Sequence, residues 1–293
     1  MKNKCVNFID LNHDRSEKIK YTYPEFSFYF HRGRFSSYPN YVMEEHWHDD
    51  VELVISLSGH MTYNVNGQLV RISEGEGIFI NSRRLHSAFS KDMAECRYIV
   101  ILFHPMILCT AKQLEQEIVL PVLNSSLDFI HLKQDVTWEN EIIRYVHLIA
   151  ERKDENVAVL TAIGSLHFIW SEIIQHSDIK LITAKNDTQL SILKTMISFV
   201  HEYYPEKITL TEIAKSGCVS KRTCGNLFLK YVHKTPIAFL NDYRLRKSIE
   251  LMQNTDMTIL EISLACGFSG ASYYAECFRR SFGKSPTEYR KNR

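Results

Sequence analysis

The chain has 293 residues, which is enough for two domains with a core in each. Its content of 45% hydrophobic and 24% charged residues is typical of a soluble globular protein, and seven cysteines without a C-x-x-C pair indicate neither a disulfide framework nor a zinc finger. The N-terminus lacks the apolar core of a signal peptide and no run approaches the ~18 apolar residues of a membrane span, so we expect a cytoplasmic protein with no membrane partner.

The net charge of +1 hides an uneven distribution. Residues 188–293 contain 16 Lys and Arg against 9 Asp and Glu, whereas residues 1–187 contain 19 against 25. A basic C-terminal third on an acidic body favours a polyanion partner for that third alone. Chance scatter of surface charge is the alternative interpretation.

Residues 24–105 contain short stretches rich in β-branched and aromatic residues, which predict strands. The predicted strands are 26–30, 51–57, 61–65, 77–80 and 98–103. Asn66-Gly67 is the strongest short signal for a hairpin turn. Many short strands at regular spacing favour a small barrel or jelly roll.

A group of metal-ligating residue types lies within this region. On a strand, His46 and His48 point to one face because side chains alternate, and Glu52 keeps the same parity if no bulge intervenes. His86 follows later in the chain. Three imidazoles and a carboxylate can close on a divalent metal inside a barrel, so a divalent metal is the one candidate cofactor.

The spacing from His46 through Gly59 resembles the first motif of the cupin superfamily, over residues 35–100. The second motif is only partly present, with Asn81 and Arg83 where cupins usually carry Pro and Gly before the last His. The resemblance implies a metal site, an effector pocket for a sugar or an aromatic compound, or buried structural histidines. The candidate pocket residues are Phe28, Tyr41, His46, Trp47, His48, Glu52, Phe79 and His86.

Two amphipathic helices are predicted at 137–153 and 157–175, and they either cover the barrel or form a dimer seam. Their apolar faces consist of Trp138, Ile142, Tyr145 and Ile149, and of Val159, Ile163, Leu166, Trp170 and Ile173. The polar stretch 177–189 predicts a linker between a sensor domain at 1–176 and a second domain at 190–293.

The second domain contains one helical pattern twice, 49 to 50 residues apart. Each copy opens with T-x-x-E, at Thr209 and at Thr258, which is the capping-box signature of a helix start. The copies predict helix-turn-helix units at 209–231 and 258–281, joined by a helix at 236–253.

Polar residues of the two second helices are the candidates for contact with double-stranded DNA. They are Ser220, Lys221, Arg222, Thr223, Asn226 and Lys230 in the first unit, and Ser269, Ser272, Tyr273, Glu276, Arg279 and Arg280 in the second. Asn226 suits adenine. Glu276 can accept a hydrogen bond from a cytosine amino group, or it can pair with Arg280. Arg279 and Arg280 can bind phosphate groups.

The stretches 244–269 and 272–290, which include Ala265-Cys-Gly-Phe-Ser269 and Gly283-Lys-Ser-Pro-Thr-Glu-Tyr289, resemble the signature of the AraC/XylS family of bacterial transcription regulators. About 100 residues match. The resemblance implies effector-responsive control of transcription, usually activation, by a dimer bound near RNA polymerase. The first unit departs from the family pattern at Cys224, Asn226 and His233, and Gly225 weakens its second helix.

We therefore expect an α+β two-domain protein with a cupin-like β-barrel and flanking helices, followed by an all-α tandem helix-turn-helix domain. The expected function is a sequence-specific transcription regulator, not an enzyme, that a small molecule in the barrel controls. A metal-dependent cupin enzyme fused to a DNA-binding tail and a regulator without an effector are the alternatives.

Overall fold

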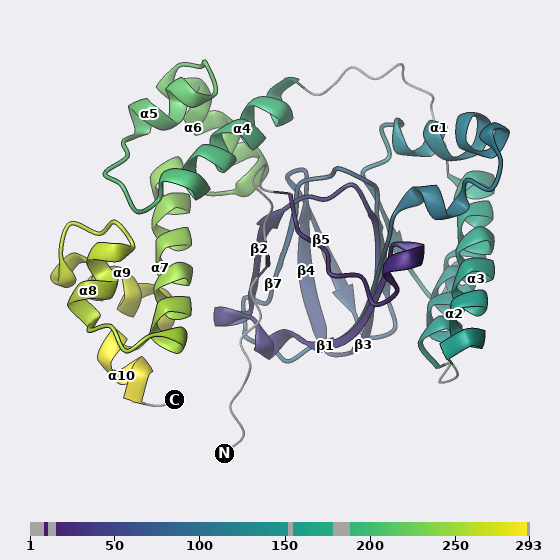
Figure 1. The fold of residues 1–293 in the computed structure, drawn as a ribbon, viewed down its shortest axis with the longest axis horizontal. Coiled ribbons are helices and arrows are strands. Elements are labelled where there is room, and N and C mark those ends of the chain that lie inside the picture. Colours follow the sequence, from purple (N-terminus) through teal and green to yellow (C-terminus); the bar gives the residue numbers. More distant parts are fainter. Residues whose placement is uncertain (1–8, 11–15, 152–154, 178–187, 292–293) are drawn as a thin grey trace. The chain divides into compact units, whose positions relative to one another are not determined.

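The computed structural model describes residues 9–10, 16–151, 155–177 and 188–291 (Figure 1). The chain forms two compact units, Phe8–Lys185 and Asn186–Arg293, and each is described by itself. The expected linker at 177–189 lies largely outside the described residues, which omit 178–187. Its last two residues are helical, because α4 begins at Thr188.

The first unit is built on two antiparallel sheets. One has the strand order β1-β8-β3-β6-β9 and the other the order β2-β7-β4-β5. The strands are β1 (Phe28–Arg34), β2 (Val42–His46), β3 (Val51–Ser58), β4 (His60–Val65), β5 (Gln68–Ser73), β6 (Gly77–Ile80), β7 (His86–Phe89), β8 (Arg97–Phe103) and β9 (Phe129–Leu132). The sequence does not predict β2, β5, β7 and β9, which are acidic, largely exposed or only four residues long.

The hairpin between β4 and β5 has the predicted turn. Val65 pairs with Gln68, so only Asn66 and Gly67 connect the strands. Both have positive φ, at 48° and 87°. This backbone matches the twist of the flanking strands, and Asn and Gly adopt it most readily.

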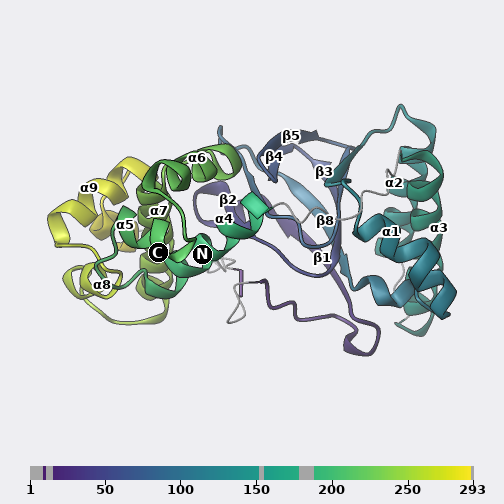
Figure 2. The same cartoon turned by 90° about the horizontal axis from the view of Figure 1, so that it is seen from above.

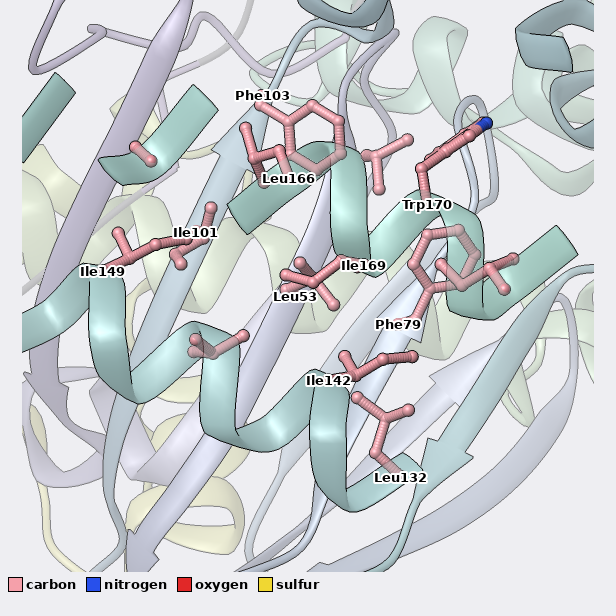
Figure 3. Packing of buried hydrophobic residues seen from close by; sticks show 14 of the residues in the cluster. Leu53, Phe79, Ile101, Phe103, Leu132, Ile142, Ile149, Leu166, Ile169 and Trp170 are labelled. Carbon is pink, nitrogen blue, oxygen red and sulfur yellow. The ribbon is translucent and has the colours of Figure 1, made fainter. Parts of the chain in front are cut away.

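Two apolar cores lie on the two faces of the five-stranded sheet. Along β3 the side chains alternate, so that Val54 belongs to the core between the sheets, whereas Leu53 and Ile55 face the helices. Figure 3 shows Leu53 and Phe79 of the sheet in one apolar cluster with Ile142 and Trp170 of the helices. The first unit therefore has three layers, namely the four-stranded sheet, the five-stranded sheet and the helices.

Helices α2 (Thr137–Glu151) and α3 (Glu155–His176) form the outer layer (Figure 2). Leu166 and Ile173 on α3 are fully buried, as predicted, which confirms that the pair covers the sheet within one chain. Val159 and Ile163 are only half-buried. The shorter helical segments are η1 (Pro24–Phe26), η2 (Phe35–Ser37), η3 (Pro39–Tyr41), η4 (Pro105–Leu108), the π-helical η5 (Leu114–Val119) and α1 (Leu120–Leu123).

The second unit is entirely helical in its described residues. Its helices are α4 (Thr188–Tyr203), α5 (Leu210–Ser216), α6 (Lys221–Val232), α7 (Pro236–Asn254), α8 (Ile259–Ala265), α9 (Ala271–Phe282) and α10 (Pro286–Lys291). The helix-turn-helix units α5–α6 and α8–α9 both pack on α7. The predicted tandem arrangement is thus confirmed.

Both predicted capping boxes are present. The amide of Thr209 donates to Glu212 at 2.7 Å, and the amide of Thr258 donates to Glu261 at 2.7 Å. In each case the threonine hydroxyl accepts the glutamate amide in return. Helix α10 was not predicted, although Ser285-Pro-Thr-Glu288 carries the same signal and the amide of Ser285 donates to Glu288.

Two glycines of the second unit should respond in opposite ways to alanine. A methyl group at Gly225 would point into open space, whereas at Gly217 it would lie 2.8 Å from the Cγ atom of Met196. We expect Gly225→Ala to raise the free energy of unfolding by up to ~1 kcal/mol through helix propensity. Gly217→Ala should lower it by about 1–2 kcal/mol through crowding. Urea denaturation followed by circular dichroism measures both, and equal effects would contradict this packing.

Candidate DNA-binding helices and a buried histidine cluster

The turn of each helix-turn-helix unit requires one residue with positive φ. In the second unit this residue is Gly267, with φ of 78°, where a methyl group would lie 2.4 Å from the carbonyl oxygen of Tyr204. In the first unit the equivalent residue is Cys218, with φ of 53°. A non-glycine residue pays about 1–2 kcal/mol for this conformation. The first turn is therefore the less favourable of the two.

All twelve candidate DNA-contact residues are exposed. They lie on the outer faces and N-terminal turns of α6 and α9, with Ser220 and Ser269 just before each helix. The inner faces are closed by Leu227 and Phe228 in α6 and by equivalent buried residues in α9. The two second helices thus present polar side chains outward while their apolar sides hold the unit together.

Several of these residues already have intramolecular partners. Ser220 caps α6 by accepting the amide of Thr223 at 3.1 Å, as predicted. Lys230 donates to Tyr231 at 2.8 Å, and Tyr273 accepts from Asn241 at 3.0 Å. These bonds hold side chains in place at the outer face.

The polar groups of other candidates are not engaged within the described residues of the second unit. Within the described part of the chain, the side chains of Arg222, Asn226 and Arg279 make no hydrogen bond or ion pair. Glu276 does not pair with Arg280, whose guanidinium instead lies 3.6 Å from the sulfur of Cys277. The intrahelical alternative for Glu276 is therefore wrong.

The histidine cluster lies where strands of both sheets meet. His46 ends β2 and pairs with His86 at the start of β7, whereas Glu52 lies in β3 of the other sheet. His48 follows the end of β2, in the segment that leads to β3. The expectation that both histidines lie on one strand is corrected for His48, because β2 ends at His46 and the chain bends only at Asp49 and Asp50. The side chain of His48 nevertheless reaches the cluster, as predicted.

The four side chains converge tightly. One ligand atom from each of His46, His48, Glu52 and His86 lies within 4.8 Å of the others, and all four residues are buried. The Oε2 atom of Glu52 is 3.3 Å from the Nε2 atom of His48 and 3.1 Å from that of His86. The other oxygen of Glu52 accepts the hydroxyl of Tyr63 at 2.9 Å.

The backbone decides the tautomer of all three histidines. The Nδ1 atom of His46 lies 2.8 Å from the carbonyl oxygen of Glu44, and that of His86 lies 2.8 Å from the carbonyl oxygen of Arg84. The Nδ1 atom of His48 has the same kind of partner at 3.0 Å. A carbonyl only accepts, so each Nδ1 carries the proton and each neutral ring keeps a lone pair on Nε2. When all three rings are neutral, these lone pairs and the Glu52 carboxylate form the donor set of a divalent metal site; without an ion, a charged His48 donates from Nε2 to Glu52 instead.

Burial governs the charges of the cluster without an ion. Burial, followed by the charges of His86 and His48, holds the pKa of His46 well below its usual range. Burial also acts to lower the pKa of His48, but the Glu52 hydrogen bond and the Glu17 charge raise it to about 9. Burial acts to raise the pKa of Glu52, but the neighbouring histidines hold it well below its usual range. A carboxylate buried this deeply needs positive charge beside it.

Glu17 lies beside the cluster but was not among the predicted site residues. Its Oε2 atom lies 3.6 Å from the Nε2 atom of His46 and 4.0 Å from that of His48, and its side chain is 22% exposed. Its amide donates to the carbonyl oxygen of Trp47 at 2.8 Å. Burial raises the pKa of Glu17 to about 7, against the opposing charge of His48. No local pattern marks this residue, because its partners come from a strand end much later in the chain.

Two aromatic members of the expected pocket lie elsewhere. Phe28 and Phe79 face the helices, on the opposite side of the five-stranded sheet from Glu52. Their assignment to the pocket is corrected, because strand alternation turns them away from the cluster. Tyr41 packs against the core between the sheets, and Trp47 is half-buried between two cluster histidines in sequence.

A cavity of about 260 Å³ lies beside α3. Its lining is mainly apolar and includes Ile118 of η5 together with Trp170 and Ile174 of α3. Since Trp170 packs on Phe79, this cavity belongs to the helix-covered side of the sheet and is separate from the histidine cluster.

Helix α3 is more apolar than the sequence analysis stated. Val157–His176 has a mean hydropathy of 1.7 over 20 residues, so by length and composition alone it could cross a membrane. The expectation that no run approaches this length is therefore wrong. Ala162, Leu166 and Ile169 on its inner face are buried against the sheet, as in the core helix of a globular domain.

Comparison with known families and proteins agrees with this architecture. Residues 30–132 match the AraC-like ligand binding domain, and residues 213–292 match a helix-turn-helix domain family. The HTH-type transcriptional regulator YdeC of Bacillus subtilis (strain 168), itself uncharacterized, is 27% identical over 84% of this chain and 85% of its own length. The HTH-type transcriptional activator RhaS of Salmonella schwarzengrund (strain CVM19633) is 25% identical over 87% of this chain and 90% of its own length.

Two solved structures are similar to the chain in part. The fatty-acid-bound ToxT of Vibrio cholerae is 14% identical over 90% of this chain and 95% of its own, with a TM-score of 0.45. The DNA-bound domain of AdpA is 25% identical over 34% of this chain and 90% of its own, with a TM-score of 0.33. On the two family matches and the full-length relatives, the chain belongs to the AraC-type DNA-binding transcription regulators, with an AraC-like ligand-binding domain ahead of its helix-turn-helix domain.

Proposed function

We propose that this regulator activates transcription by laying α6 and α9 into successive major grooves of its operator, about one helical turn (~34 Å) apart. The observation that carries this proposal is the repeated unit itself, in which both second helices turn exposed polar residues outward from one shared helix, α7. The excess of basic residues at 188–293 supports phosphate contact. Activation would involve RNA polymerase as a partner, in the cytoplasm.

The two second helices would read different bases. At equivalent positions, α6 carries Asn226 and α9 carries Glu276, which suit adenine and cytosine respectively. Arg222 is the second residue of α6, and the equivalent second residue of α9 is the uncharged Ser272. Arg279 and Arg280 would hold phosphates, which add affinity and salt dependence without sequence information.

A second copy of the chain is the proposed partner of α3. The face of α3 that points away from the sheet carries a stripe of Val157, Leu160, Gly164 and Phe168. Within this stripe, Leu160 is 72% exposed and Phe168 is 59% exposed. Phe168 stacks on Tyr145 of α2 at 5.3 Å, which extends the apolar surface. Gly164 has open space beside it, so the stripe has a notch between large side chains. Such a surface is complementary to itself in a two-fold dimer.

The proposed ligand of the N-terminal domain is a divalent transition metal held by His46, His48, Glu52 and His86. The Nδ1 hydrogen bonds to backbone carbonyl groups leave the Nε2 atom of each ring to bind an ion beside the carboxylate, once any proton on Nε2 has been displaced. Metal bonds of about 2.1 Å place neighbouring donor atoms roughly 3.0–3.4 Å apart, close to the distances around Glu52 Oε2. The ion would join the two sheets. The relatives are transcription regulators, which favours a sensing role for the cluster over catalysis.

Single substitutions in α6 test the DNA contacts. On an operator selected from a random duplex library, Asn226→Ala should weaken binding by about 1–3 kcal/mol and relax base preference at one position. Arg222→Ala should weaken binding and lower the salt dependence by about one counterion. Electrophoretic mobility shift at several salt concentrations measures both. Lys112→Ala, which removes a charge from the N-terminal unit, is the control. Unchanged affinity for both α6 variants would refute the placement of this helix.

The dimer surface is tested by two changes on α3. Leu160→Glu places a charge in the stripe and should shift the protein toward monomer by at least tenfold in dissociation constant. Gly164→Leu improves helix propensity, yet it fills the notch and should also weaken association. Sedimentation equilibrium gives the constants, and Gln175→Glu near the end of the helix serves as the charge control. Dimers that survive both changes would show that the copies meet elsewhere.

Metal content tests the ligand. Protein purified without chelators should contain close to one equivalent of a transition metal by inductively coupled plasma mass spectrometry. His48→Ala and His86→Ala should each lower the affinity by tenfold or more, because each removes a donor. His60→Ala, which removes a partly exposed histidine outside the cluster, should leave the content unchanged. Background metal in the wild type, even after addition of zinc, iron or manganese, would refute the site.

A further inference from the structure

We propose that the cavity beside α3 is a binding site for a small, neutral, bicyclic aromatic compound that carries one N–H or O–H donor, such as an indole or a naphthol. The ligand would lie between η5 and α3, which both line the cavity. The site is separate from the histidine cluster, and it requires neither the metal nor the dimer proposed above.

The volume of the cavity sets the size of the ligand. This volume is about 260 Å³, whereas an apolar cavity of about 150 Å³ already stays dry and binds benzene. A second fused ring therefore fits. Water gains little in such a cavity, because a mainly apolar lining offers it few hydrogen-bond partners.

One wall of the cavity is held in place by packing and a hydrogen bond. Trp170 lines the cavity, and its ring meets those of Phe79 and Phe103 edge-on, with centroids 6.3 and 6.5 Å apart (Figure 3). The indole N–H of Trp170 donates to the carbonyl oxygen of Ile118 at 3.4 Å. Phe79, which was expected in the barrel pocket, thus supports this cavity instead. A ligand that meets a wall already in position does not have to order it, which favours binding.

A second wall is the π-helix η5. This winding is rare in proteins and occurs frequently at functional sites. Leu114 and Ile118 of η5 both line the cavity, yet Leu114 is only half-buried and Ile118 is 38% exposed. A ligand that covers these apolar side chains removes them from water, which favours binding.

The polar side chains of the lining decide which functional group the ligand needs. The Nδ1 atom of His167 lies 2.7 Å from the carbonyl oxygen of Ile163. A carbonyl only accepts, so Nδ1 carries the proton and the neutral ring has its lone pair on Nε2. An N–H or O–H group of a ligand is complementary to this acceptor. None of the described lining residues is Lys or Arg, so a carboxylate has no cationic partner there.

Calorimetric titration of the full-length protein with indole and with benzofuran tests the chemistry of the site. The two probes have the same shape, but benzofuran has an oxygen in place of the N–H group. At about pH 8, where imidazole is normally neutral, indole should bind with a dissociation constant of about 1 mM or lower. Benzofuran should bind roughly tenfold more weakly. In His167→Phe the two probes should bind equally well, and a chelator should change none of these constants.

Two substitutions that fill the cavity locate the site. Leu114→Trp and Ile174→Trp each place a large ring in the cavity, and each should weaken indole binding by about tenfold or more. Gln116→Trp adds the same ring to an exposed residue of η5 outside the lining, so it should bind indole as the wild type does. Circular dichroism checks the fold of all three variants. In the wild type, indole should also slow amide hydrogen exchange in residues 114–119.

Three results would overturn the proposal or a part of it. If the wild type does not bind indole, the cavity is not a site for this class of ligand. If both cavity-filling variants bind indole as tightly as the wild type, the ligand binds elsewhere. Equal affinity of the wild type for indole and benzofuran would overturn the role of His167. The proposed metal site is unaffected in each case, because metal content is measured separately.

Discussion

Both apolar cores and the histidine cluster of the N-terminal unit depend on β3, a strand that is buried on both faces. Its odd-numbered residues Leu53 and Ile55 pack under the helices, whereas Glu52 and Val54 face the other sheet. A carboxylate at this depth carries a large desolvation cost unless cationic groups or an ion compensate it. The histidines around Glu52 supply that compensation, and they come from the ends of β2 and β7, so the two sheets must stay in register for the cluster to form.

The side chains of β3 also determine where α2 and α3 pack. Because Leu53 and Ile55 point outward, the five-stranded sheet needs an apolar cover, which α2 and α3 provide. Helix α3 is apolar on more than one side, and this leaves Leu160 and Phe168 exposed once its inner face is buried. Sequence reasoning offered a cover or a dimer seam as alternatives. The structure shows that α3 covers the sheet, and the exposed Leu160 and Phe168 on its other face belong to the surface of the proposed dimer.

In the C-terminal unit, the two repeats share a framework but differ in how well their local sequence fits it. Both start with a capping box, and both pack a phenylalanine of the second helix into the core. The first repeat has Cys218 where the turn needs a positive φ, and it has Gly225 where the second repeat has Ala275. It also has a side-chain cap, Ser220, where the second repeat has Gly270. The residues that destabilise the local backbone therefore lie in the turn and the helix interior of the first unit. In the second unit they lie at the start of α9.

The sequence by itself determined the helix starts, the hairpin turn, the tandem repeat and the identities of the four cluster residues. Each of these depends on neighbours within a few positions, such as a threonine and a glutamate three residues apart, or on spacing that one family uses repeatedly. Only the tertiary structure decided which face of the sheet each aromatic residue occupies, that His48 reaches the cluster from beyond the end of β2, and that Glu17 lies beside the cluster. These depend on strand pairing between distant segments, and short strands such as β2 and β7 leave too little local pattern to predict that pairing.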